Sequence, residues 1–120
     1  IYSDAQVDGW KPITKAVHDA GSKIVAQIWH VGRITHPGLT GGAHPIGASA
    51  IAPNVVAYTH EGKVDIPAPH ALSTAEITEV IQQFRQAAAN AIRAGFDGVE
   101  IPISVLMLMV VQLKIVAASL

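Results

Sequence analysis

The chain lacks cysteine altogether, which excludes disulfide bonds and thiolate ligands for a metal ion. Charged residues are also scarce, at 14% of the sequence, and they nearly cancel to a formal net charge of −1. A chain so close to neutral offers no electrostatic basis for binding nucleic acid or an acidic membrane surface. With 120 residues it has room for one small domain at most. The first residues include neither a basic stretch nor an early apolar segment, so we expect no secretory signal.

Long apolar runs are missing too, although the end of the chain is nearly free of charge. After Glu100 the only charged residue is Lys114, among residues that are mostly Ile, Val, Leu, Met and Ala. The unbroken apolar part covers residues 105–111, whereas a membrane-spanning helix needs roughly 20 mainly apolar residues. A membrane helix is therefore the less favoured interpretation, because short apolar runs more often belong to a core or a strand. We expect the tail to be helical or extended and poorly anchored to the rest of the chain. A membrane or partner contact through this apolar tail is kept as an alternative.

A helix followed by a strand is predicted near the beginning of the chain. Ser3 and Gln6 match a capping box, in which each side chain bonds the backbone of the other residue. Gly21 indicates the helix end, because glycine readily takes the left-handed conformation found there. An apolar strand is then expected from Lys23 onward. The apolar positions that share one helical face are Ile13, Ala16, Val17 and Ala20.

A second helix and strand follow the same plan. Ser73 and Glu76 form another capping box, and Gly95 marks the helix end before a short apolar strand at residues 98–101. Helices that alternate with apolar strands favour an α/β fold, in which a parallel sheet is covered by helices. The apolar residues at helical spacing are Ile77, Val80, Ile81, Phe84, Ala88, Ala91 and Ile92.

The segment between the two units, residues 36–70, is rich in Gly, Pro and Ala and is interpreted as a long loop. Within it, residues 58–66 predict a small hairpin with Glu61 and Gly62 at the turn. Loops of this length are usually functional or disordered. Three of the six histidines, His30, His36 and His44, lie near one another in the sequence, but their spacing matches no compact zinc pattern. No metal site is predicted.

Polar and aromatic residues gather where the first strand ends. Gln27, Trp29, His30 and Arg33 follow or interrupt the apolar run that begins at Lys23. Ligands of α/β proteins bind at the carboxyl ends of parallel strands, so chemistry is expected here. Arg33 has the guanidinium needed to meet a phosphate or carboxylate, although loop arginines are more often simply solvated. Asp97 and Glu100 are interpreted as turn and strand-end residues rather than as an acid/base pair.

Several short motifs occur in one order over the first 101 residues and together resemble the old yellow enzyme family, the FMN-dependent NADPH ene-reductases. Within that family they are most like the plant 12-oxophytodienoate reductases. The motifs include Gln27-Ile28-Trp29-His30-Val31-Gly32-Arg33, Ala48-Ser49-Ala50-Ile51-Ala52-Pro53, Leu72-Ser73 and Ala94-Gly95-Phe96-Asp97-Gly98-Val99-Glu100-Ile101.

The resemblance implies part of a (β/α)₈ barrel. Residues 1–101 would form about two barrel units with an active-site-side loop, and residues 102–120 a divergent apolar tail. The implied cofactor is FMN with NADPH as reductant, and the implied substrate is a small α,β-unsaturated carbonyl such as an oxylipin enone. By resemblance, Gln27 hydrogen-bonds the pyrimidine edge of the flavin and Trp29 shapes the substrate pocket. Members of the family are expected in the cytoplasm or in peroxisomes.

The chain departs from the family after Ile101. There the family has a His and a His or Asn that hold the substrate carbonyl, then a Tyr that protonates the substrate carbon. This chain has Pro102-Ile103-Ser104-Val105-Leu106-Met107 instead, so no catalytic residue is assigned. We expect the chain alone to be inactive. A reading-frame change after Ile101, or a truncated product without catalysis, is the alternative interpretation.

Overall fold

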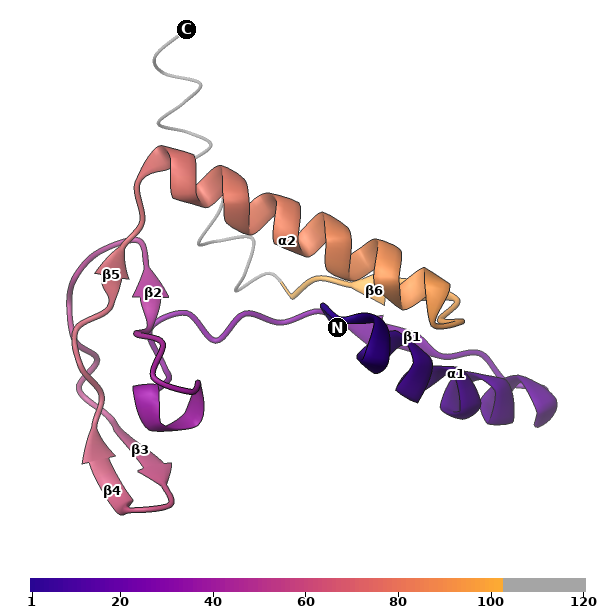
Figure 1. The fold of residues 1–120 in the computed structure, drawn as a ribbon, viewed down its shortest axis with the longest axis horizontal. Helices are drawn as coiled ribbons and strands as arrows, with labels where there is room; N and C mark the ends of the chain where they lie inside the picture. The colour runs from indigo at the N-terminus through magenta and orange to yellow at the C-terminus, as the bar shows by residue number, and fades with distance from the viewer. Residues whose placement is uncertain (103–120) are drawn as a thin grey trace, which may run out of the picture. The chain divides into compact units, whose positions relative to one another are not determined.

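The computed structural model describes residues 1–102, and the predictions made for the tail lie outside them. The chain divides into two compact units (Figure 1). Within the described range, the helix–strand unit comprises residues 1–29 and 77–102, and the loop unit comprises residues 30–76. The elements in chain order are α1 (Asp4–Asp19), β1 (Val25–Gln27), the 3₁₀ helix η1 (Pro37–Leu39), β2 (Ile46–Gly47), β3 (Val56–Thr59), β4 (Gly62–Asp65), β5 (His70–Ala71), α2 (Thr74–Arg93) and β6 (Gly98–Glu100).

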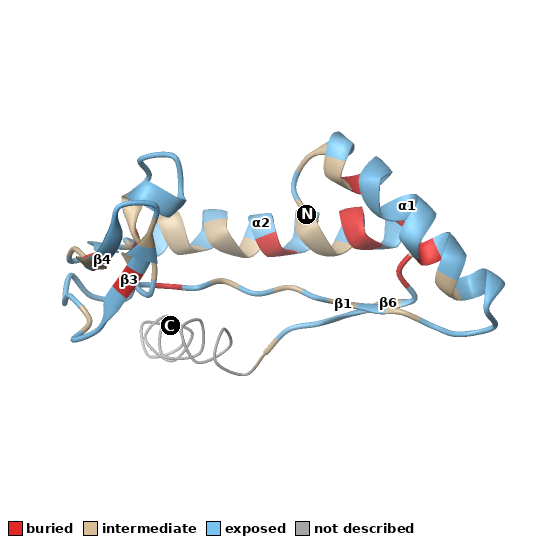
Figure 2. Ribbon diagram, turned by 90° about the horizontal axis from the view of Figure 1, so that it is seen from below, coloured by how far each residue is buried: buried red, intermediate tan, exposed pale blue. Residues whose placement is uncertain are grey.

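In the helix–strand unit, β1 and β6 pair in parallel, with Val25 opposite Gly98 and Gln27 opposite Glu100. This confirms the predicted parallel sheet. A core from both helices and the turn after α2 covers one face of the pair, and Ile24 and Ala26 pack against it. The core residues are Val7, Ala91, Ala94 and Phe96. Figure 2 shows these helices on one side of the strands, which are themselves largely exposed.

Both helices begin and end as their sequences predict. At α1, Ser3 Oγ accepts from the backbone N–H of Gln6 at 3.3 Å, and the Gln6 side chain accepts from the N–H of Ser3 at 3.2 Å. At its other end Gly21 has φ +75°, and its N–H donates to the carbonyl of His18. At α2, Gly95 has φ +93° and its N–H donates to the carbonyl of Ile92. Both ends are Schellman motifs, which need a left-handed residue that glycine supplies without strain.

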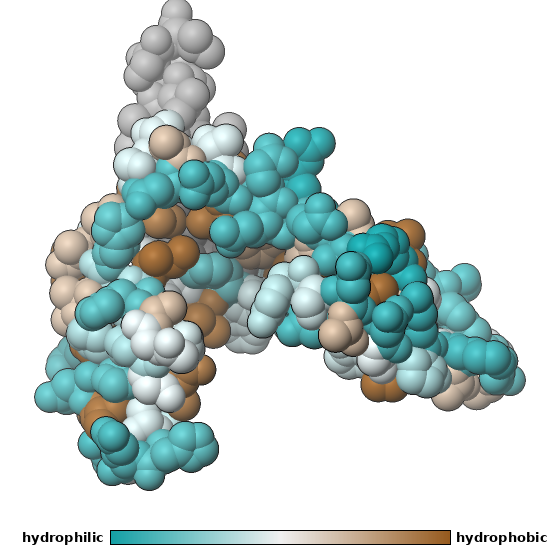
Figure 3. Space-filling model, viewed as in Figure 1, coloured by the Kyte–Doolittle hydropathy of each residue, from teal (hydrophilic) through white to brown (hydrophobic). Residues whose placement is uncertain are grey.

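The predicted buried faces of the helices are only partly right. On α1, Ile13 is 47% exposed whereas Thr14 is buried, because the Thr14 hydroxyl donates to the carbonyl of Ala94 at 2.6 Å. On α2, Ile92 is 56% exposed whereas Asn90 is buried, because the Asn90 amide donates to the carbonyl of Ile1. In each case a polar side chain can occupy the interior because a partner distant in the sequence satisfies it. Figure 3 shows that hydrophilic side chains dominate the surface over the two helices.

The loop unit holds more structure than its sequence suggested. The hairpin is present as antiparallel β3 and β4, but Thr59 pairs with Gly62, so its turn is at His60 and Glu61. The predicted turn was one residue too late, since Gly62, with φ +102°, already belongs to β4. A parallel pair, β2 with β5, was not predicted because each strand has only two residues. Across residues 1–102, no helix has the length and apolarity needed to cross a membrane.

The start of α2 is expected to weaken in acid because of Glu76. The backbone N–H and hydroxyl of Ser73, together with His70, lower the pKa of the Glu76 carboxyl from 4.5 to about 2. A carboxylate whose pKa is lower in the folded chain contributes stability above its unfolded pKa. That contribution is therefore fully present above about pH 4.5 and lost as the pH falls through about 2.

Circular dichroism across this pH range should show a larger loss of helix in the wild-type chain than in Glu76→Gln. Glutamine preserves the length of the side chain and its bond to the N–H of Ser73, but it does not titrate. Other carboxylates titrate in both proteins, so the difference between the two curves isolates Glu76. If the pH curves of the wild-type chain and Glu76→Gln superimpose, the role assigned to Glu76 at the start of α2 is wrong.

Candidate functional site

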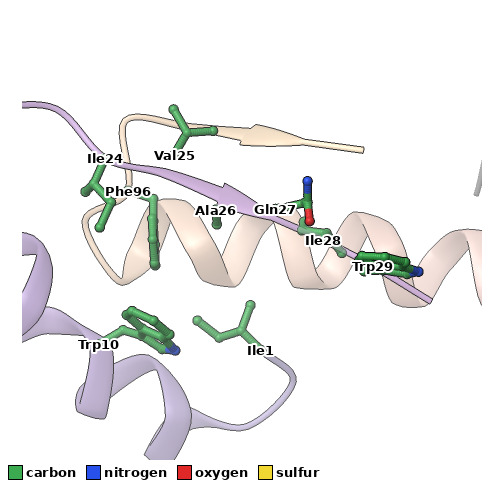
Figure 4. A pocket seen from close by; sticks show the side chains of 9 residues that line it. All are labelled: Ile1, Trp10, Ile24, Val25, Ala26, Gln27, Ile28, Trp29 and Phe96. Atoms are coloured by element: carbon green, nitrogen blue, oxygen red, sulfur yellow. The ribbon is translucent and has the colours of Figure 1, made fainter. Parts of the chain in front are cut away.

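The two faces of β1 have different environments. Ile24 and Ala26 point toward the core, whereas Val25 and Gln27 are exposed on the opposite side. Figure 4 shows this alternation directly, because the side chains of Val25 and Gln27 leave the strand on the side away from Ile24 and Ala26. In a parallel sheet that helices cover on one side, a polar residue on the other side is free to meet a ligand.

Gln27 ends β1, and its partner Glu100 ends β6. The side chains lie on the same face, where Gln27 Nε2 donates to Glu100 Oε2 at 3.2 Å. Both residues are exposed, so the amide also offers its oxygen and a second N–H to the surroundings. The sequence predicted Gln27 as a functional residue and Glu100 as a strand end, but it did not predict that the two interact. The signal was available only through the strand register, since 73 positions separate them.

Trp29 lies two residues beyond the end of β1 and is 66% exposed. Exposure alternates from residue 24 to residue 29, so the odd-numbered positions Gln27 and Trp29 are both solvent-accessible. The strand reaches only Gln27, and Trp29 follows it in an extended segment. An exposed indole of this size provides apolar surface on which a flat ligand ring can stack.

A pocket of about 460 Å³ runs beside β1 (Figure 4). The Trp10 and Phe96 rings form one part of its wall, with centroids 5.2 Å apart and planes tilted by 58°. Gln27 also lines this pocket, with its amide directed away from Ile1 and Trp10 (Figure 4). The pocket is lined by Ile1, Trp10, Ile24, Val25, Ala26, Gln27, Ile28, Trp29 and Phe96.

At the opposite end of the two strands, Asp97 acts as a structural clasp. Its carboxylate accepts from the backbone N–H of Ile24, from Lys23 Nζ and, when the ring carries its proton there, from His18 Nε2, each at 2.9 Å. The backbone bond and the His18 contact are the main causes that hold the pKa of Asp97 far below its ordinary value. This agrees with the interpretation of Asp97 as a turn residue. The clasp joins the segments that lead into β1 and β6 and is compatible with their parallel register.

In the loop unit, His30 and Arg33 make local contacts. His30 Nδ1 accepts from the backbone N–H of Gly32 at 2.9 Å, and burial lowers the pKa of the ring. A neutral imidazole with its proton on Nε2 fits both facts. Arg33 donates to the carbonyl of Ile51 at 3.3 Å and is otherwise exposed, as loop arginines commonly are. Within residues 1–102, no three His, Asp or Glu side chains gather as they would around a metal ion.

The chain is similar to known proteins over most of its length. Residues 1–105 match the model of the NADH:flavin oxidoreductase / NADH oxidase family. The chain is 43% identical over 101 residues to flavin oxidoreductase hxnT of Emericella nidulans, covering 84% of this chain and 26% of that protein. It is 42% identical over 105 residues to 12-oxophytodienoate reductase 7 of Oryza sativa subsp. japonica, covering 84% and 27%. The chain thus spans about a quarter of the length of these curated relatives.

Solved structures agree with the family match and with the fold. The old yellow enzyme homologue of Zymomonas mobilis superimposes with a TM-score of 0.79 at 44% identity, covering 84% of this chain and 28% of that one. Morphinone reductase in complex with tetrahydroNAD gives 0.74 at 39% identity, covering 84% and 30%. These relatives are (β/α)₈ barrels, and the described α/β units correspond to part of such a barrel. The predicted resemblance to old yellow enzymes and to 12-oxophytodienoate reductases is confirmed.

Proposed function

Because this chain belongs to the NADH:flavin oxidoreductase / NADH oxidase family, we propose that it represents the flavin-contacting β1–β6 portion of an FMN-dependent ene-reductase. In this proposal Gln27 hydrogen-bonds the flavin and Trp29 borders the substrate. Residues 1–101 form the barrel portion, and residues 102–120 are a divergent tail. The substrate class is a small enone, and NADPH is the reductant. The bound flavin would accept hydride from NADPH and pass it to the β-carbon of the enone.

The position of Gln27 carries the proposal. Its amide stands at the carboxyl end of a parallel strand, on the face that the helices leave open. An amide that offers both an acceptor and a donor matches the pyrimidine edge of a flavin, where an N–H lies beside a carbonyl. Since Trp29 is exposed two residues beyond Gln27, an aromatic surface is also available in this part of the chain. The residues present therefore fit this part of the cofactor.

We further propose that the 120-residue chain alone neither binds FMN tightly nor reduces enones. Gln27 contributes a hydrogen-bonding group worth on the order of 1 kcal/mol, whereas micromolar binding requires roughly 8 kcal/mol. Barrels commonly hold a phosphate with loops after their last strands, and the β1–β6 portion does not include those. The chain also has none of the family's carbonyl-gripping and proton-donating residues at positions 102–107.

FMN titration of the purified chain tests this proposal in two ways. Flavin fluorescence should show no saturable quenching at or below a few micromolar, the range that roughly 8 kcal/mol would give. At higher FMN concentrations, ¹⁵N NMR should show shifts concentrated at the Gln27 side chain and the ends of β1 and β6. These shifts should disappear in Gln27→Ala and persist in the control Gln83→Ala, which replaces an exposed glutamine on α2.

Two results would contradict the proposal. Micromolar quenching that is lost in Gln27→Ala but kept in Gln83→Ala would show that the chain is sufficient for tight binding. Shifts spread evenly over the surface, or absent at Gln27, would show that Gln27 is not a flavin contact.

A further inference from the structure

Glu100 accounts for the orientation of the Gln27 amide. The two residues are opposite each other at the ends of β1 and β6, and Gln27 Nε2 lies 3.2 Å from Glu100 Oε2. An ionised carboxylate only accepts hydrogen bonds. If the amide were reversed, its oxygen would face a carboxylate oxygen and the two acceptors would repel each other. The carboxylate therefore selects one of the two amide orientations.

This orientation determines what Gln27 can offer a ligand. One Nε2 hydrogen is used by Glu100, which leaves Oε1 as an acceptor and the second Nε2 hydrogen as a donor. Both groups belong to one planar amide on the face of β1 that the helices leave open, and Figure 4 shows its nitrogen farther from the strand than its oxygen. They match an imide edge, in which a ring N–H lies next to a carbonyl. They match less well a ring whose N–H has been replaced by a methyl group.

We propose that Glu100 is a positioning residue, which fixes the Gln27 amide so that Gln27 selects a ligand with an imide N–H beside a carbonyl. The inference rests on the flavin contact of Gln27 proposed above and adds a role for a residue outside that contact. Glu100 acts through Gln27 and does not itself need to touch the ligand. Because the side chains at paired positions share a face, this arrangement depends on the strand register, with which the Asp97 clasp is compatible.

Glu100→Gln tests the orientation in the chain without ligand. The substituted amide has nearly the same shape but can donate or accept, so it no longer dictates which way Gln27 points. In ¹⁵N NMR spectra, one Gln27 Nε2 proton of the wild-type chain should be shifted downfield by its bond to the carboxylate. That shift should be lost in Glu100→Gln and retained in Glu79→Gln, which removes an exposed carboxylate on α2. Unchanged circular dichroism will confirm that each variant is folded.

The selectivity is tested with FMN and N3-methyl-FMN as probes. In the wild-type chain and in Glu79→Gln, FMN should perturb the Gln27 side chain at lower concentration than N3-methyl-FMN does. In Glu100→Gln, half-saturation by FMN should need about threefold more ligand, the effect of losing part of one exposed hydrogen bond. The preference for FMN over the methylated probe should shrink accordingly.

The outcomes separate this inference from the proposed function. If Glu100→Gln leaves both the Gln27 proton shift and the preference for FMN unchanged, the positioning role is wrong. If FMN perturbs Gln27 equally in all variants, the flavin contact stands and the positioning role fails. If the proton shift depends on Glu100 but no variant responds to FMN, Glu100 does orient Gln27, whereas the proposed flavin contact is wrong.

Discussion

Phe96→Ala is expected to unfold much of the helix–strand unit. Phe96 is 7% exposed and is the one aromatic side chain among the core residues Val7, Ala91, Ala94 and Phe96. Its ring also contacts the Trp10 ring of α1. Truncating a buried phenylalanine to alanine typically costs about 3–5 kcal/mol. Since small domains have only about 5–15 kcal/mol of stability, a loss of this size is decisive for a core of four residues.

Urea unfolding followed by circular dichroism is the direct measurement. Ile92→Ala on α2 is the matched control, because it also truncates a large apolar residue but one that is 56% exposed. Surface changes of this kind usually alter the free energy of unfolding by about 0.5 kcal/mol or less. A Phe96→Ala chain that unfolds at the same urea concentration as Ile92→Ala would show that the described core does not hold the unit together.

The local features of this fold were predictable because their causes are local. Each capping box joins residues three positions apart, and each Schellman motif ends at a glycine in the left-handed region. Any chain with Ser3 and Gln6 at that spacing has the groups needed to start a helix. The same reasoning holds for Ser73 and Glu76. Prediction therefore succeeded at the helix ends and at the parallel pairing that two such units imply.

The errors arose where distant partners decide the outcome. Ile13 and Ile92 were expected in the core on hydropathy alone, but Thr14 and Asn90 are buried instead. Their polar groups bond the carbonyls of Ala94 and Ile1, which are 80 and 89 positions away. The spacing of apolar residues along the helices contains no information about those distant partners. Hydropathy therefore identified the helices correctly but placed Ile13 and Ile92 inward, whereas the polar residues one and two positions away are buried instead.

The candidate site likewise combines a residue that the sequence could identify with a contact that depends on a distant partner. Gln27 was identifiable because a polar residue at the end of an apolar strand is unusual and because its motif resembles a known family. The pairing of Gln27 with Glu100 depends on the register of β1 and β6. Asp97, just before β6, bonds the backbone N–H of Ile24, just before β1, and this contact is consistent with that register. The sequence contains all of these residues, but only the folded chain brings them together.

Gly95→Ala is expected to destabilise the chain far more than Gly21→Ala, although both glycines end a helix. Gly95 has φ +93° and Gly21 has φ +75°, so alanine at either site incurs the left-handed penalty of about 1 kcal/mol. At Gly21 the added Cβ has no atom within 4 Å. At Gly95 it would lie 2.7 Å from Thr14 Oγ1, a buried hydroxyl that donates to the carbonyl of Ala94.

Alanine at position 95 must therefore displace Thr14 and weaken its hydrogen bond. Leaving a buried polar group unsatisfied costs about 1–3 kcal/mol, which brings the expected total for Gly95→Ala to about 3 kcal/mol, against about 1 kcal/mol for Gly21→Ala. Urea unfolding of the two variants measures the difference. Equal losses of stability would show that the Cβ contact at position 95 is relieved at no cost.

A double-mutant cycle identifies the source of the extra cost. In a Thr14→Ala background the hydroxyl that the new Cβ meets is gone, so Gly95→Ala should then cost close to the left-handed penalty alone, about 1 kcal/mol. Coupling of about 2 kcal/mol between positions 14 and 95 is the expected result, since residues in contact are not additive. Additive losses would assign the whole effect to the backbone of Gly95. Strong coupling would show that the turn before β6 and the buried face of α1 pack against each other through Gly95 and Thr14, so that a change in one alters the other.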